Sequence, residues 1–221
     1  MTERKIVDLG SFYFVPAVVN FMKIPTRMDN TFDKRPSIYS GTLSNNILID
    51  VEENKINFVT TDSCRMSVVT VEGNYKNQVG KYIFSTNDFF RGFYKGWEKK
   101  DKKKTFVYDI IFPENSTRDV NFPSWQHLIK NTDGENFIDD IIISYGGDLA
   151  VKFMNQRAFN SRFIYEFVKV AEELYDCSQD KLIGRTDKNY KSSHGTLQDP
   201  VYFNFTFGEF VMTHLIMPVR D

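Results

Sequence analysis

One stretch, from Asn46 to Val71, constrains the fold of this chain more than any other. Apolar side chains recur at every second position on either side of Glu53-Asn54, which predicts a two-stranded hairpin with one half-buried face. A polar corner, Thr61–Met66, follows the hairpin, and the β-branched run Ser67–Val71 predicts a third strand. The corner combines a cationic and a thioether side chain. This combination indicates a surface that receives a ligand, although the corner alone does not identify that ligand.

Composition limits what else the chain does. Its 221 residues have room for two modest domains or one large one, and the 41% of hydrophobic residues can fill a core. The net charge is −1, so any contact with DNA must come from local clusters. Cys64 and Cys177 lie far apart and form neither a metal-ligand spacing nor a disulfide framework. We therefore expect a cytoplasmic protein with no cofactor, no metal, no signal peptide and no membrane span.

The first two helices are each predicted to follow a strand. A strand over 6–14 precedes a helix over 15–24, in which Pro16 suits the first turn and Pro25 ends the helix. A strand over 81–84 precedes a helix over 87–97, whose aromatic residues fit a 3.6-residue period.

The same order returns near the C-terminus. Strands over 138–145 and 149–154 precede a helix from Asn160 or Ser161 to Tyr175. The polar segment 176–199 predicts a long mobile loop. Further strands are predicted over 37–43, 105–112, 201–207 and 210–217. The sequence thus predicts an α+β fold built from repeated β-α-β-β-β units.

Each predicted helix has a polar face with basic residues at helical spacing. These residues are Asn20, Lys23 and Arg27, then Arg91, Lys95 and Lys99, then Arg162 and Lys169. An amphipathic helix needs a polar side, which Lys and Arg commonly fill. Recurrence in all three helices favours instead a set of helices that present positive charge to phosphates. The lysine-rich segment 99–104 fits either a functional basic loop or a solubilising turn.

Patterns typical of catalysis are weak in this sequence. The three histidines lie in no metalloprotease or Cys-His pattern, and no glycine-rich phosphate loop is present. Cys64 beside Arg65 fits a reactive thiol, but a cysteine at a sheet corner is more often structural. The acidic pairs Asp139-Asp140 and Glu172-Glu173 fit solvated faces. We therefore predict that the chain is not an enzyme.

The C-terminal residues His214–Asp221 stay apolar almost to the end of the chain, where most chains fray. They fit a docked final strand, or an adaptable methionine-lined pocket with Arg220 at its rim.

Five motifs, in order, resemble the bacterial sliding clamp, the β subunit of DNA polymerase III. Phe58–Met66 is similar to the clamp's corner, with Ser63-Cys64 in place of Gly-His. The other motifs are Arg35–Gly41, which resembles the strand before the corner, Phe122–Ile129, which resembles the linker between the second and third clamp domains, Phe159–Ile164, which resembles the start of a third-domain helix, and Met217–Arg220, which resembles the clamp's C-terminus.

The resemblance implies two clamp domains, residues 1–130 and a shortened 131–221, with antiparallel sheets outside and helices on the inner face. It implies a DNA-replication processivity factor that encircles duplex DNA and meets a polymerase and a clamp loader through short linear peptides. With two domains per chain, a closed ring would be a head-to-tail homotrimer. The implied peptide-binding groove consists of Tyr39, Thr61, Ser63, Cys64, Arg65, Met66, Leu215, Met217, Pro218, Val219 and Arg220. The corner and the C-terminus are therefore expected to touch.

Two other functions stay open at this point. A clamp-derived adaptor or decoy would bind the polymerase or loader peptide without encircling DNA, and so would show no salt-sensitive retention on DNA. A small enzyme with Cys64 as its nucleophile would lose its activity in a Cys64→Ala variant.

Overall fold

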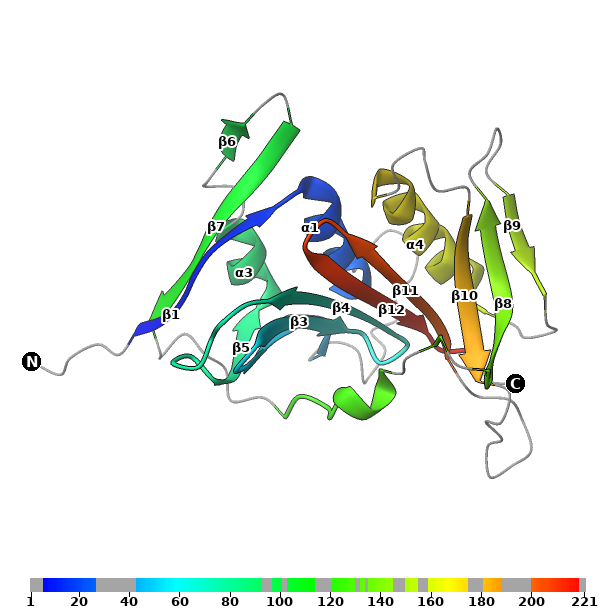
Figure 1. Cartoon of the computed structure of the whole chain (residues 1–221), viewed down its shortest axis with the longest axis horizontal. Coiled ribbons are helices and arrows are strands. Elements are labelled where there is room, and N and C mark those ends of the chain that lie inside the picture. The colour runs from blue at the N-terminus through cyan, green and yellow to red at the C-terminus, as the bar shows by residue number, and fades with distance from the viewer. Residues whose placement is uncertain are drawn as a thin grey trace, which may run out of the picture.

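The protein has an α+β fold with a large antiparallel sheet and few helices (Figure 1). The computed structural model describes residues 6–26, 43–92, 97–100, 103–113, 121–129, 132–133, 135–144, 150–154, 159–174, 181–187 and 200–218.

Nine strands of the described chain form one antiparallel sheet, in the spatial order β5-β2-β3-β4-β12-β11-β10-β8-β9. Their bounds are β2 Asn46–Glu52, β3 Lys55–Thr61, β4 Arg65–Glu72, β5 Gly80–Ser85, β8 Phe137–Ser144, β9 Ala150–Phe153, β10 Lys181–Asp187, β11 Val201–Phe207 and β12 Phe210–Ile216. A second sheet has the order β1-β7-β6, with β1 Ile6–Phe14, β6 Trp97–Lys100 and β7 Lys103–Pro113.

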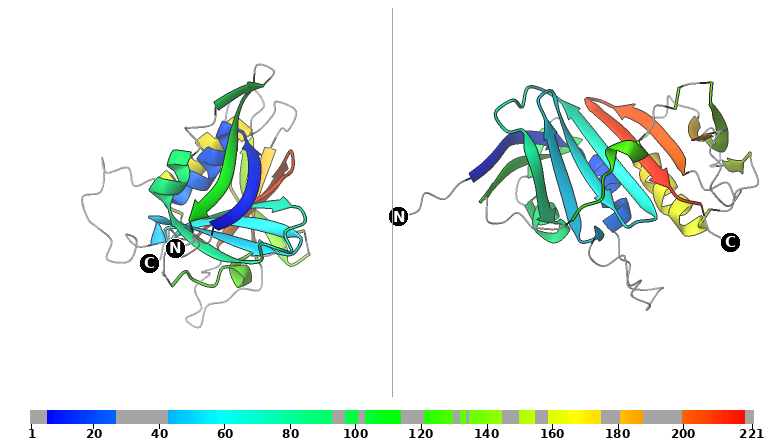
Figure 2. Two further views of the ribbon diagram at one scale, coloured as in Figure 1. Left: turned by 90° about the vertical axis from the view of Figure 1, so that its left-hand side faces the viewer. Right: turned by 90° about the horizontal axis from the view of Figure 1, so that it is seen from below.

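Three α-helices of the described chain lie on one side of the nine-stranded sheet (Figures 1 and 2). They are α1 Pro16–Lys23, α3 Thr86–Gly92 and α4 Ser161–Leu174. The Phe21 ring of α1 meets the Phe167 ring of α4, with 6.5 Å between centroids, so these two helices pack side by side on the sheet. A sheet with helices along one face agrees with the arrangement of sheets and helices that the resemblance implies.

The predicted first helix is confirmed at both ends. α1 begins at Pro16, and a short 3-10 turn, η1 Ile24–Thr26, continues through Pro25. The end of the helix leaves carbonyl groups that need donors. The Thr26 hydroxyl donates to the carbonyl of Lys23 at 2.9 Å, and the buried Thr60 hydroxyl of β3 donates to that of Met22 at 2.7 Å. The second of these bonds ties α1 to the sheet.

The predicted hairpin is present as β2 and β3, but its expected half-buried character is wrong. Both strands are buried on both faces for nearly their full length. One face packs under the helices, with Ile49 and Phe58 in the main core. The other face is covered by residues 121–129, which lie across it. The segment that covers this face lies far from the hairpin in the sequence. The alternation of apolar residues in the hairpin therefore cannot predict that the second face is buried.

The second predicted helix is shorter than expected. α3 ends at Gly92, and Trp97 begins the strand β6. Lys99 therefore lies on a strand, where it pairs with Lys104 of β7, and does not share a helix face with Arg91. A short run of aromatic residues is compatible with both a helix and a strand. Here the pairing with β7 makes residues 97–100 a strand.

The predicted loop over 176–199 is also wrong in part, because β10 lies within it. β10 pairs with β8 along its length and joins β11 through Arg185 and Tyr202. Gly184 lies against the Phe203 ring, and a Cβ atom at position 184 would approach that ring to 2.6 Å. The strand is short and mostly polar, so its pairing with two neighbours, which the sequence does not show, defines it.

Candidate functional site

The corner between β3 and β4 is held by its own side chains. The Asp62 carboxylate accepts the backbone N–H of Cys64 at 3.0 Å and that of Arg65 at 2.7 Å. The Thr61 hydroxyl donates to the carbonyl of Arg65 at 2.7 Å and accepts the N–H of Ser63 at 3.2 Å. Ser63 has φ of 74°, in the left-handed region that a glycine would occupy without strain. Hydrogen bonds from side chains to the backbone therefore stabilise the turn at this corner.

The C-terminal strand lies directly against this corner. β12 pairs with β4 so that Leu215 stands opposite Met66, and the Met217 N–H donates to the Cys64 carbonyl at 2.9 Å. The two segments expected to touch, although distant in the sequence, are thus neighbours in the sheet.

A second apolar cluster, here called the outer-face cluster, lies on the side of the sheet away from the helices. Its buried members are Leu48, Val59, Met66, Val68, Trp125, Tyr202 and Leu215. Partly buried residues pack around them, namely Ile83, Phe122, Leu128, Ile129, Phe137 and Met217. Met217, Leu128 and Ile129 therefore offer apolar surface to solvent beside the corner, and they form the candidate binding surface.

The segment 121–129 is fixed on the outer face by one carboxylate. Asp50 of β2 is 4% exposed, and its Oδ2 atom accepts the Trp125 indole N–H at 3.0 Å and a Gln126 amide N–H at 2.8 Å. The Lys81 Nζ atom lies 3.6 Å from the same oxygen. Asp50 thus anchors the segment that packs Leu128 and Ile129 against the outer-face cluster.

The groove inferred from the sequence omitted this segment. The motif Phe122–Ile129 is its sequence signal, and the resemblance relates that motif to a linker between domains. The structure adds Leu128 and Ile129 to the candidate surface, and it adds Phe137 from β8.

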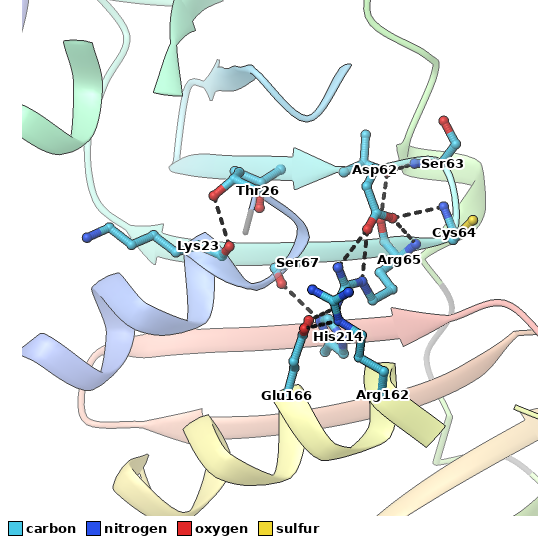
Figure 3. Close-up of polar contacts among 12 residues, drawn as sticks. Lys23, Thr26, Asp62, Ser63, Cys64, Arg65, Ser67, Arg162, Glu166 and His214 are labelled. Atoms are coloured by element: carbon cyan, nitrogen blue, oxygen red, sulfur yellow. Dashed lines mark hydrogen bonds and ion pairs between the residues drawn. The ribbon is translucent and has the colours of Figure 1, made fainter. Parts of the chain in front are cut away.

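The placement of Arg65 corrects the sequence-based groove. Arg65 is 4% exposed and lies on the helix side of β4, opposite Met66 (Figure 3). It forms an ion pair with Asp62 at 2.8 Å and another with Glu166 of α4. Its guanidinium group lies 4.1 Å from the centroid of the Phe163 ring. Successive residues of a strand point to opposite faces, so Arg65 and Met66 do not line one groove.

A buried serine–histidine pair lies behind Arg65 on the same side of the sheet. The Nδ1 atom of His214 is 2.9 Å from the Ser67 hydroxyl, and its ring stacks on Phe167 of α4 at 4.7 Å. Its Nε2 atom has no hydrogen-bond partner among the described residues. Burial, and secondarily the charge of Arg65, lower the pKa of His214 well below its usual value. The imidazole is therefore neutral in the folded chain.

The remaining residues of the predicted groove divide into three groups. Ser63 and Cys64 are exposed at the corner, and Pro218 is half-buried beside Met217. Thr61 is buried, and its hydroxyl stabilises the turn. Tyr39, Val219 and Arg220 lie outside the described residues.

The predicted helix-face residues have different surroundings. Asn20 donates to Glu173 of α4 at 2.8 Å, and the Lys23 Nζ atom lies 5.1 Å from the centroid of the Phe90 ring. Arg162 forms an ion pair with Glu166 at 2.7 Å. The others are Arg91 and Lys169, which are exposed, Lys99, which lies on β6, and Arg27 and Lys95, which fall outside the described residues.

The charge of the helix face is balanced. The three helices carry four cationic residues, Lys23, Arg91, Arg162 and Lys169, and four acidic residues, Asp88, Glu166, Glu172 and Glu173. The described helices therefore supply no net positive charge towards a phosphate backbone.

The described part of the chain contains no group of three or more potential metal-binding side chains. Asp140 is fully buried, which corrects the expected solvated position, whereas Asp139 is 46% exposed and contacts Arg185 at 3.3 Å. Within the same residues, no helix has the length and hydropathy needed to cross a bilayer.

Solved bacterial sliding clamps share this fold. The clamp from Caulobacter crescentus matches with a TM-score of 0.54 and 10% identity over 100% of this chain and 68% of its own. The Helicobacter pylori clamp in complex with diflunisal has a TM-score of 0.52, with 13% identity over 100% and 68% of the two chains. The H. pylori clamp bound to a DNA ligase peptide has a TM-score of 0.50, with 13% identity over 100% and 67%. No protein-family model and no curated protein matches the sequence.

Proposed function

We propose that the chain is a processivity clamp of DNA replication, which encircles duplex DNA and holds a polymerase through a short linear peptide. The observation that carries this proposal is the match of the whole chain to sliding clamps, one of which is described as bound to a DNA ligase peptide. Residues 1–130 and 131–221 would correspond to two clamp domains. The same peptide surface would also serve the clamp loader.

The proposed ring is a head-to-tail homotrimer, in which different ends of neighbouring chains meet. The edge strand β9 offers such an end, because Val151 is 37% exposed and Phe153 is 48% exposed. These residues stand opposite Ile143 and Ile141 of β8, which are buried in the core. The apolar face of the sheet therefore continues past its covered part to an open edge, as an interface would require.

We expect light scattering at micromolar concentration to give three times the mass of one chain, and electron microscopy to show closed rings. Phe153→Glu places a charge on the open β9 edge and is expected to yield monomers. Val211→Glu, at a position 45% exposed on β12, serves as its control and should leave the assembly intact. The ring would be refuted if the wild type is a monomer and does not increase the length of DNA that a polymerase synthesises in one binding event on a circular primed template.

The proposed peptide site lies on the candidate binding surface of Met217, Leu128 and Ile129. A flexible, partly exposed methionine beside two aliphatic side chains suits an apolar anchor residue of a short peptide. The Arg65 side chain lies on the other side of the sheet and is not part of this peptide site.

Met217→Ala is expected to weaken binding of a polymerase C-terminal peptide by at least about tenfold, in the range of interface hot spots. Met217 is half-buried, so the unfolding midpoint should change little. The matched control, Val211→Ala, truncates an exposed residue of the neighbouring strand β12. Fluorescence anisotropy measures both affinities, and equal affinities for the two variants would remove the peptide site from this surface.

A clamp-derived adaptor is the second candidate, and the balanced charge of the helix face favours it. An adaptor would retain the peptide surface while lacking the electrostatic attraction that holds DNA. In that case the peptide would bind, and duplex DNA would not be retained on a closed circular template at any salt concentration.

A further inference from the structure

Segment 121–129 crosses the outer face of the large sheet without joining its hydrogen-bonded ladders. In Figure 1 it lies below the nine-stranded sheet, on the side away from α1 and α4. Among the described residues, two hydrogen bonds join this segment to the rest of the chain, and both end on the Oδ2 atom of Asp50. The donors are the Trp125 indole N–H at 3.0 Å and a Gln126 amide N–H at 2.8 Å. One carboxylate is thus the polar anchor of the whole segment.

The packing of this segment is equally concentrated. Trp125 is 5% exposed, and it is the one fully buried residue of the segment. The backbone N–H groups of Leu128 and Ile129 donate to carbonyl groups inside the segment and not to the sheet. The strands β2 and β3, in contrast, pair with neighbours on both sides along nearly their full length. A segment with one buried side chain and no ladder opens at a lower free energy than the strands beneath it.

Opening of this segment would remove part of the candidate binding surface. Leu128 and Ile129 follow Trp125 through the short 3-10 turn η3 Gln126–Leu128, and they pack on the same outer-face cluster as Met217. Because the turn joins them, release of the Trp125 indole would also withdraw Leu128 and Ile129 from the cluster. A ligand held by these two side chains and Met217 therefore binds only when the segment is closed.

We propose that segment 121–129 is a strap that opens and closes over the outer face as a unit, and that Asp50 is the latch that keeps it closed for peptide binding. This inference rests on the proposed peptide site and adds its regulation. Without the carboxylate, the buried Trp125 N–H has no acceptor, and opening relieves that cost because water then reaches the group. The apparent peptide affinity follows the fraction of chains with a closed strap. Asp50 is therefore a positioning residue that acts on the site through Trp125.

The first test compares Asp50→Leu and Asp50→Asn with Glu72→Leu, which removes an exposed carboxylate from β4 of the same sheet. Asp50→Leu is expected to weaken binding of a labelled polymerase C-terminal peptide by about tenfold, the population change that loss of one hydrogen bond to a charged group produces. Asp50→Asn keeps an acceptor oxygen and should lose less affinity. Glu72→Leu should bind as the wild type does. Fluorescence anisotropy measures all four affinities.

A second substitution separates a latch from a general loss of structure. Trp125→Phe added to Asp50→Leu removes the donor as well as the acceptor, and replacing both partners of a buried hydrogen bond by apolar groups costs little. The double variant is therefore expected to bind the peptide more tightly than Asp50→Leu alone. Damage to the sheet would instead accumulate, and the double variant would then bind more weakly.

Hydrogen exchange followed by mass spectrometry gives a readout that needs no peptide. In the wild type, the N–H groups of Leu128 and Ile129 are expected to exchange faster than those of β2 and β3, and faster still in Asp50→Leu. Saturating peptide should slow this exchange, because a ligand that needs the closed strap must also favour it.

Three results would overturn the latch. These are exchange of segment 121–129 no faster than that of β2 and β3, equal peptide affinities of Asp50→Leu and Glu72→Leu, and a double variant that binds more weakly than Asp50→Leu. A wild type that binds no peptide refutes the proposed function instead. The strap and its latch then stand if exchange still depends on Asp50, and they fall if it does not.

Discussion

The Arg65→Ala variant is expected to lose about 3–5 kcal/mol of unfolding free energy, the usual cost of removing one partner from a buried ion pair. Arg65 is 4% exposed, and it neutralises Asp62 of the corner and Glu166 of α4. Without it, two carboxylates that are each 13% exposed remain with less compensation. Phe163 also loses the guanidinium group that lies over its ring. Urea denaturation followed by circular dichroism measures the effect.

Two further variants test the cause of this loss. Lys55→Ala breaks an exposed pair with Glu52, and such pairs contribute at most about 1 kcal/mol, so it should change stability little. Arg65→Met combined with Glu166→Leu removes both charges of the pair with α4, while Asp62 keeps its two backbone N–H donors. This double variant should recover part of the stability, because apolar residues can replace a buried pair. An Arg65→Ala variant as stable as Lys55→Ala would contradict the buried position of Arg65.

Stability is expected to fall as the pH drops below about 6.5, the ordinary pKa of histidine, because His214 is buried without charge. Burial, and then the charge of Arg65, lower the pKa of His214 in the folded state. Below pH 6.5 the unfolded chain binds a proton that the folded chain does not bind. The unfolding free energy therefore decreases with falling pH, by about 1.4 kcal/mol per pH unit, until the folded pKa is reached.

The matched variant for this prediction is the double substitution Ser67→Ala and His214→Phe. It removes the titrating group. It also removes the Ser67 hydroxyl, which the loss of His214 alone would leave without its hydrogen-bond partner. Urea unfolding between pH 7 and pH 5 is expected to show a clearly smaller slope in this variant than in the wild type. Identical slopes for the two proteins would show that His214 is not the group responsible.

The sequence predicted those parts of the fold that depend on local pattern. Pro16 and Pro25 set the ends of α1, alternation predicted β2, β3 and β11, and the strand predicted after Gly208-Glu209 is β12. The end of α3 and the strand β10 were missed, because pairing partners decide them and local propensity does not.

The candidate site was predicted in part for the same reason. The corner and the C-terminus were expected to meet, and β4 pairs with β12. The two-residue period of a strand places Arg65 and Met66 on opposite faces, so this part of the groove was open to correction from the sequence itself. The bond from Trp125 to Asp50 joins residues 75 positions apart, and no local pattern indicates such a partner.

The ladder between β4 and β12 joins the chain's early and late parts through backbone hydrogen bonds, not through a flexible tether. A fragment that ends near residue 130 would retain β4 as a bare edge, with Met66 and Val68 covered only in part, because Tyr202 and Leu215 belong to the missing part. An open edge beside apolar side chains is a template for association between chains. The early part of the chain is therefore exposed to aggregation during synthesis until the last strand emerges from the ribosome and closes the sheet.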